Sequence, residues 1–243
     1  MEDRDTHARS FGPAAGRYER GRPPYPSAAV EWLLPQGARR VLDLGAGTGK
    51  LTRQLLGRGL EVTAVDPSDG MLAEMHRVLP EVSALTGTAE QIPLSEQSVD
   101  AVLVAQAWHW VDRARAVPEV ARVLTPGGRL GLIWNLRDER EDWVRRLGQI
   151  LGSAATRRDA AVGPPFGPVE IRDFGWTHRI GPEQLLDLVA SRSYVILLPP
   201  DERAGLLAQV RQLIATHPSL VGRTLFELPY VTQCVRASLP PAA

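Results

Sequence analysis

Cysteine is nearly missing from this sequence, and most of its histidines lack the spacing of metal ligands. Cys234 is the only cysteine among 243 residues, which excludes an intramolecular disulfide and a metal site built from several cysteines. Four histidines are scattered along the chain, at His7, His76, His178 and His217. Their separations match no zinc-site pattern, so we expect no metal.

Long apolar runs and a surplus of charge are also missing. No stretch approaches the roughly 18 apolar residues that a membrane span requires, and residues 1–10 lack the apolar core of a secretion signal. We therefore expect a cytoplasmic protein that contacts no membrane. The 28 basic and 28 acidic residues cancel. Nucleic-acid binding usually needs a basic surplus, so the balance argues against a nucleic-acid partner.

Between residues 40 and 135, short apolar runs alternate with segments of helical periodicity. The apolar runs predict strands at 41–44, 61–65, 82–85, 101–104 and 129–134. The segments between them predict helices at 51–56, 68–77 and 113–124, after a first helix at 27–34. Each connection is long enough for a crossover, which favours a doubly wound, mostly parallel α/β sheet.

After residue 135 the alternation is less regular. We expect helices at 142–151, 182–190 and 201–215, and two late strands at 169–180 and 224–236. The simplest organisation is one domain, 27–243. Its second half, mainly 138–222, is expected to add a helical cap over the carboxyl edge of the sheet.

A glycine-rich turn, residues 43–49, follows the first strand. Glycines at alternate positions let the backbone bend sharply and lie against a ligand. A phosphate-binding P-loop is excluded because only three residues separate Gly45 from Gly49, and Leu51 stands where Ser or Thr is required. A dinucleotide site is disfavoured because Lys50 replaces the third glycine. A tight turn without a ligand is the remaining alternative.

An acidic residue ends the second predicted strand. Asp66 stands where a carboxylate can accept hydrogen bonds from both hydroxyls of a ribose. Because Pro67 and Ser68 follow it, Asp66 can also begin the next helix, and the two roles are compatible. Together with the glycine turn, Asp66 favours a bound ligand over a plain turn.

Five motifs in order resemble those of class I S-adenosylmethionine-dependent methyltransferases, in their small-molecule branch. They are residues 41–49, 65–71, 87–93, 99–102 and 124–128. The resemblance implies a seven-stranded, Rossmann-like methyltransferase fold. It also implies an enzyme that passes the methyl group of S-adenosyl-L-methionine to a small-molecule acceptor by in-line displacement and leaves S-adenosyl-L-homocysteine.

The resemblance implies a set of contacts at the glycine turn. Gly45, Ala46 and Gly47 are expected to approach the amino-acid part of the cofactor. Asp43 is expected to orient its ammonium group, and Asp66 to hold the ribose hydroxyls.

It implies a second set of contacts around the adenine and the methionine part. Pro67 and Met71 are expected to line the adenine pocket, although Met71 is equally compatible with a plain core position. Ala89 and Glu90 are expected to reach the adenine edge, where many relatives carry Asp instead. Gln106 is expected to contact the methionine part through its backbone.

Two tryptophans flank a histidine after the fourth strand, at Trp108, His109 and Trp110. This cluster is unusual for a surface loop and is similar to the branch that contains trans-aconitate methyltransferases. Aromatic faces attract a sulfonium cation. His109 is the candidate catalytic base, with substrate binding and a structural role as open alternatives. A carboxylate acceptor would need no base.

Further acceptor contacts are expected outside this loop. Residues 18–26 resemble a lid in the same branch, which makes residues 1–26 a tail and lid, although a plain proline-rich connector is the alternative. Tyr18 and Arg22 would close the site, with Arg22 attracting an anionic group. Residues 191–194, which end in Tyr194, follow the helix at 182–190, where relatives contribute substrate contacts. Further candidates past the fifth strand are Trp134, Asn135 and Arg137.

Two other functions were weighed. A scaffold of the same fold that binds the cofactor without turnover is the main alternative to the enzyme. A nucleic-acid methylase is disfavoured because no Asn/Asp-Pro-Pro-Tyr/Phe motif follows the fourth strand. The methylated atom, O, C or N, is left open, and the chain is expected to be a monomer or a homodimer.

Overall fold

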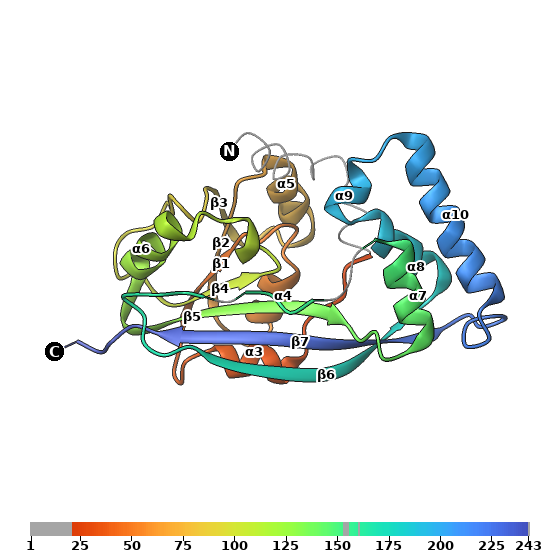
Figure 1. Ribbon diagram of the computed structural model, residues 1–243. Coiled ribbons are helices and arrows are strands. Elements are labelled where there is room, and N and C mark those ends of the chain that lie inside the picture. Colours follow the sequence, from red (N-terminus) through yellow and green to blue (C-terminus); the bar gives the residue numbers. More distant parts are fainter. Residues whose placement is uncertain (1–20, 153–155, 160, 243) are drawn as a thin grey trace.

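The computed structural model describes residues 21–152, 156–159 and 161–242, and its centre is a seven-stranded sheet with the order β3-β2-β1-β4-β5-β7-β6 (Figure 1). The strands are β1 (Arg40–Leu44), β2 (Glu61–Asp66), β3 (Ser83–Thr86), β4 (Val99–Ala105), β5 (Leu124–Arg137), β6 (Glu170–Ile180) and β7 (Phe226–Ser238). Strands β1 to β5 are parallel, whereas β7 pairs antiparallel with both β5 and β6. The sheet is therefore mixed: it is mostly parallel, as expected, and β7 is antiparallel to both of its neighbours.

The parallel strands are apolar because helices cover both of their faces. Four of the five residues of β1 are buried, and Val41 lies beside Val62 of β2 and Ala101 of β4 in the register. Burial on both faces favours a continuous apolar run over an alternating one. This explains why these short strands could be predicted from the sequence.

Helices cover the two faces of the parallel part of the sheet. One face packs against α3 (Ser27–Leu33) and α4 (Lys50–Leu56), with α5 (Asp69–Val78) beside them against β2 and β3. The other face packs against α6 (Arg113–Val123). The arrangement is doubly wound, as expected.

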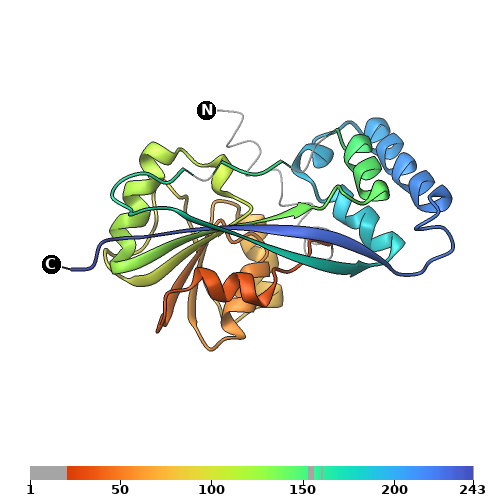
Figure 2. The same cartoon turned by 60° about the horizontal axis from the view of Figure 1, so that its bottom comes forward.

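The remaining helices gather at one end of the long strands β5, β6 and β7 (Figures 1 and 2). They are α7 (Asp142–Ile150), α8 (Pro182–Ala190), α9 (Ser193–Ile196) and α10 (Pro200–Thr216). A separate apolar cluster joins α7, α8 and α10 to the ends of β6 and β7, with the rings of Trp143 and Phe226 5.6 Å apart. This end of the molecule therefore has its own core.

Most predicted elements lie within two residues of the observed ones, but β5 is much longer than expected. Residues 124–128, which precede the predicted strand, belong to β5, and the register between β4 and β5 shifts between Val99 and Ala101 to accommodate them. At its other end β5 continues to Arg137, where it pairs with Tyr230 of β7. The antiparallel neighbour therefore extends the strand past the point where the parallel pattern ends.

In the described part of the chain, none of the helices combines the length and apolarity needed to cross a membrane.

Candidate active site

The glycine turn after β1 is a backbone bend that only glycine adopts easily. Gly45, Gly47 and Gly49 all have positive φ angles, of 72°, 57° and 88°. The N–H groups of Gly45 and Ala46 donate to the Val65 carbonyl at 2.8 and 3.1 Å, which ties the turn to the end of β2. Gly45, Ala46 and Gly47 are partly exposed, so part of the bend is accessible.

The turn also lies directly against the segment that follows β4. A Cβ atom added at Gly45 would lie 2.8 Å from the Cβ of Ala107. Such an approach is too close for any side chain, so Gly45 is required by contact as well as by its φ angle. The turn and the Trp108–Trp110 segment are therefore neighbours at the carboxyl edge of the sheet.

Asp66 lies at the end of β2 and is fixed by two backbone groups. Its Oδ2 accepts the N–H of Gly47 at 2.8 Å, and its Oδ1 accepts the N–H of Ser68 at 2.9 Å. Burial raises the pKa of Asp66, and these two hydrogen bonds oppose the rise. Each carboxylate oxygen has a second acceptor site, so two further hydroxyls can be bound. The helix cap itself is Ser68, whose side chain accepts from Met71.

Asp43 is fully buried beneath the turn. Its Oδ2 accepts the hydroxyl of Thr52 at 2.6 Å, whereas Oδ1 is buried and has no hydrogen-bond partner among the described residues. Burial raises the pKa of Asp43 to about 7, against the lowering effect of the Thr52 hydrogen bonds, and the charge of Asp66 raises it further. An unsatisfied buried acceptor is costly. A cationic or donor group that reached Oδ1, directly or through water, would remove that cost.

The residues expected around the adenine have different surroundings. Pro67 is exposed, and Met71 is 4% exposed at the start of α5. Ala89 is buried in the apolar cluster under α6. Glu90 accepts the backbone N–H of Asp112, the N-cap of α6, at 2.7 Å, so its side chain is directed at that helix.

The segment after β4 holds an uncommon backbone conformation. Gln106 has a φ of 59°, and its N–H donates to the Ile133 carbonyl of β5 at 2.9 Å. The two tryptophans of the following 3₁₀ turn differ sharply. Trp108 is fully buried in the apolar core, whereas Trp110 is 40% exposed. Trp108 therefore anchors the segment, and Trp110 is the accessible ring.

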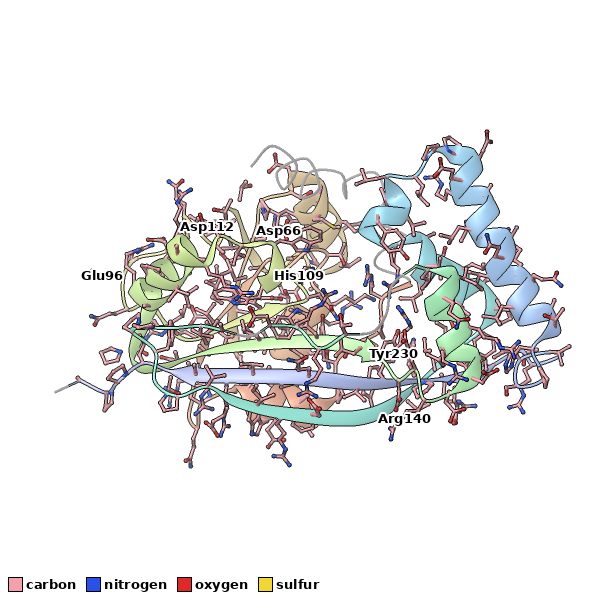
Figure 3. All side chains as sticks on the ribbon, viewed as in Figure 1. Asp66, Glu96, His109, Asp112, Arg140 and Tyr230 are labelled. Atoms are coloured by element: carbon pink, nitrogen blue, oxygen red, sulfur yellow. The ribbon has the colours of Figure 1, made fainter. Side chains whose placement is uncertain are left out.

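His109 lies between these tryptophans, above the sheet (Figure 3). Its ring centroid is 4.8 Å from that of Trp110, and its Nδ1 is buried without a hydrogen-bond partner in the described part of the chain. Burial, and to a smaller extent the charge of Arg158, lowers the pKa of His109 to about 4. The imidazole is therefore neutral near pH 7, with one nitrogen able to accept and the other able to donate.

Only part of the predicted lid belongs to the described residues, and Tyr18 lies outside them. The part that is described, 21–26, joins three elements at the carboxyl edge. Arg22 Nη2 donates to the Ser191 carbonyl after α8 at 3.2 Å, and Asn135 of β5 donates to the Pro24 carbonyl at 3.0 Å. The Tyr25 backbone exchanges hydrogen bonds with Gln54 of α4, at 2.9 and 2.7 Å.

Sequence reasoning missed a group of arginines that the fold brings together. Arg192 follows α8 and is partly buried, and its pKa falls to about 9 because of burial and the charges of Arg137 and Arg22. We call these three residues the arginine cluster. The hydroxyl of Tyr194, a predicted acceptor contact, acts electrostatically on Arg192 and is buried without a partner among the described residues. Arg22, Arg137 and Tyr194 had been singled out one by one, but no sequence pattern joined them.

A hollow of about 440 Å³ lies elsewhere, at the amino edge of the parallel strands, lined in part by Arg40, Glu61 and Asp100. There, Asp100 Oδ2 already accepts the N–H groups of Arg39 and Arg40 at 2.9 Å each. This hollow is at the wrong edge of the sheet for a crevice at the carboxyl ends of the strands. Within the described residues, no group of three or more His, Cys, Asp or Glu could hold a metal ion.

Comparison with known proteins gives a consistent result. The model of a methyltransferase domain family matches residues 42–132. An uncharacterized methyltransferase of Mycobacterium tuberculosis is 61% identical over 232 residues, which cover 95% of this chain and 96% of the relative. An uncharacterized methyltransferase-like protein of Schizosaccharomyces pombe is 32% identical, over 96% of this chain and 97% of its own.

A solved structure extends the match to the fold. The structure of a putative type II methyltransferase from Anaeromyxobacter dehalogenans aligns with a TM-score of 0.68 and 26% identity, and covers 91% of this chain and 99% of its own. The glycine turn, the acid that ends β2 and these relatives point to the same family. The chain belongs to the class I S-adenosylmethionine-dependent methyltransferases.

Proposed function

We propose that the protein transfers the methyl group of S-adenosylmethionine to a small-molecule acceptor by in-line displacement. The observation that carries this proposal is the accessible glycine turn together with Asp66, whose carboxylate is fixed by the Gly47 N–H at 2.8 Å. The geometry suits a ligand that presents a ribose to an acid and an amino-acid group to a bare backbone.

The described residues fit the donor at three points. Gly45, Ala46 and Gly47 offer partly exposed backbone. Asp66 keeps free acceptor sites for two hydroxyls, and the partnerless Oδ1 of Asp43 suits an ammonium group. S-adenosylmethionine, when bound, supplies a methyl group on a sulfonium that needs no further activation. Pro67, Met71, Ala89, Glu90 and Gln106 are proposed to complete this site.

The acceptor is proposed to bind beside Trp110 and His109. Because the neutral imidazole is a weak base with a pKa near 4, its main task is to orient the acceptor through a hydrogen bond. Where the acceptor loses a proton, that proton passes to an unprotonated ring nitrogen of His109. Trp110 then shields the reaction from water. Trp108 supports this segment from the core.

Water exclusion is also proposed for the segments above β5. The lid residues 21–26 already bridge α4, β5 and α8 through Gln54, Asn135 and Ser191. We propose that α8 and α9 act with them as a cap over the acceptor. Closure of such segments is a common means of aligning reactants and excluding solvent.

The test has two stages. Titration calorimetry with S-adenosylhomocysteine is expected to give a stoichiometric complex, and incubation with labelled S-adenosylmethionine and a metabolite extract is expected to label a small molecule. Binding without transfer to any acceptor would favour the non-catalytic scaffold. No binding at millimolar ligand would reject both.

A further inference from the structure

The arginine cluster is assembled from three distant parts of the chain at one place. Arg137 ends β5, Arg192 follows α8, and Arg22 belongs to the segment that crosses the sheet edge. Arg137 is opposite Tyr230 of β7 in the register. Figure 3 shows Tyr230 between the long strands and the base of α7, at the junction of the sheet with the second helical group.

The cluster concentrates positive charge in a partly buried place. The Arg137 side chain is 4% exposed, and Glu139 Oε1, 3.3 Å from its Nη2, offsets part of its charge. The largest electrostatic influences on Arg192 include the like charges of Arg137 and Arg22, together with the phenols of Tyr194 and Tyr230. Burying like charges together costs free energy unless a ligand of opposite charge compensates.

A hydroxyl in the same place also lacks a partner. The Tyr194 hydroxyl is buried and makes no hydrogen bond to any described residue. The ring of Tyr230 is stacked on that of Trp176 with centroids 5.4 Å apart, and both rings belong with Tyr194 to the apolar cluster at this end of the molecule. Guanidinium groups and a phenolic hydroxyl are all donors to an oxyanion, and the arginine fork matches carboxylate and phosphate oxygens in particular.

We propose that Arg192, Arg137, Arg22 and the Tyr194 hydroxyl bind an oxyanion, a carboxylate or a phosphate, carried by the methyl acceptor. Arg137 is four residues beyond Ile133, whose carbonyl holds the Gln106 segment, so the cluster belongs to the same carboxyl edge as the predicted reaction site. The assignment to the acceptor rests on the proposed function, whereas the anion site itself does not.

The test measures anion binding directly, without an acceptor assay. Thermal unfolding of the protein is followed with succinate, with inorganic phosphate and with neutral succinamide, at matched ionic strength and in the presence or absence of S-adenosylhomocysteine. One of the two anions is expected to raise the melting temperature in a saturable way, and succinamide is expected not to. The better anion identifies the oxyanion as carboxylate or phosphate.

Two variants and a control make the outcome specific. Arg192→Gln is expected to weaken the anion effect at least about tenfold. This substitution removes a cation that lies beside two others, so the melting temperature without ligand is expected to stay the same or rise. Loss of a purely structural arginine would lower the melting temperature. Tyr194→Phe is expected to weaken the anion effect less than Arg192→Gln does. It replaces Arg192→Gln as the test variant if that protein does not fold. Arg140→Gln, an 86%-exposed side chain at the same strand end, is the matched control.

The failures of the two proposals are distinguishable. If S-adenosylhomocysteine binds but neither anion raises the melting temperature, or if Arg192→Gln and Arg140→Gln behave alike, the anion site is rejected and the methyltransferase proposal stands. If an anion binds through Arg192 and S-adenosylhomocysteine does not, the anion site stands and its assignment to an acceptor fails.

Discussion

Along the carboxyl edge of the sheet, the turn after β1 and the end of β5 present different kinds of polar group. At β1 and β2 the available groups are backbone at Gly45–Gly47 and two short carboxylates, Asp43 and Asp66. At β5 they are the long side chains of the arginine cluster, which come from three separate segments. The first region suits a ligand of fixed shape, whereas the second suits a ligand of negative charge. We therefore propose that the donor binds at the first region and the acceptor at the second.

The strongest test of the first region is the substitution Gly45→Ala. The added Cβ would lie 2.8 Å from Ala107 and would require a φ of 72°, so we expect S-adenosylhomocysteine affinity to fall about 100-fold or more by calorimetry. Gly59→Ala is the matched control, because Gly59 has a φ of 73° with no atom within 4 Å of the added Cβ. Equal effects of both substitutions would mean that backbone strain alone is responsible, and the close approach to Ala107 would have no role in binding.

The next largest effect is expected for Asp66→Asn. An amide can replace only one carboxylate oxygen as an acceptor, so a backbone or ribose hydrogen bond is lost and affinity should fall roughly 10- to 100-fold. Asp69→Asn is the control, because Asp69, the first residue of α5, accepts the hydroxyl of Thr86 at an exposed position. An Asp66→Asn variant with unchanged affinity would remove the ribose role.

A third prediction concerns the proton on Asp43. Because burial raises its pKa to about 7, this carboxyl is mostly protonated at pH 6, and an ammonium placed beside it favours the ionised form. Binding of S-adenosylhomocysteine at pH 6 is therefore expected to release a proton from the wild type and less from Asp43→Asn. Calorimetry in buffers of different ionisation enthalpy measures the difference. Equal proton release by the two proteins would place the ammonium elsewhere.

The smallest effect is expected at His109, which lies between the two regions. Burial and Arg158 lower its pKa to about 4, so its ring signal in nuclear magnetic resonance should not titrate between pH 5.5 and 8. The signal is assigned by its loss in His109→Gln. Between pH 6.5, the usual histidine pKa, and about pH 4, His109 binds a proton in the unfolded chain but not in the folded one. The contribution of His109 to stability is therefore present above pH 6.5 and declines below it. A titration midpoint near 6.5 would contradict this environment.

The two regions also differ in how far the sequence predicts them. The turn at 43–49 and Asp66 are local features, because a buried strand and its glycines are adjacent in the chain, and both lie where they were predicted. The arginine cluster depends on contacts between residues more than 50 positions apart, such as Arg22 with Ser191, which no local period encodes.

The late strands show the same limit. The segments of β6 and β7 were predicted, but the antiparallel pairing of β7 with β5 and β6 was not, because strand direction follows from how the chain returns around α7 to α10 rather than from side-chain alternation. The buried state of Trp108 was missed for a related reason. A tryptophan in a loop is indistinguishable in sequence from its neighbour Trp110 until the core under α6 is known.

A crystal structure of the complex with S-adenosylhomocysteine tests the central claim most directly. We predict that the ligand lies over Gly45–Gly47, with both ribose hydroxyls within hydrogen-bond distance of the Asp66 carboxylate and without contact to the arginine cluster. Density for the ligand at another place, or an Asp66 side chain without contact to the ribose, would contradict the account.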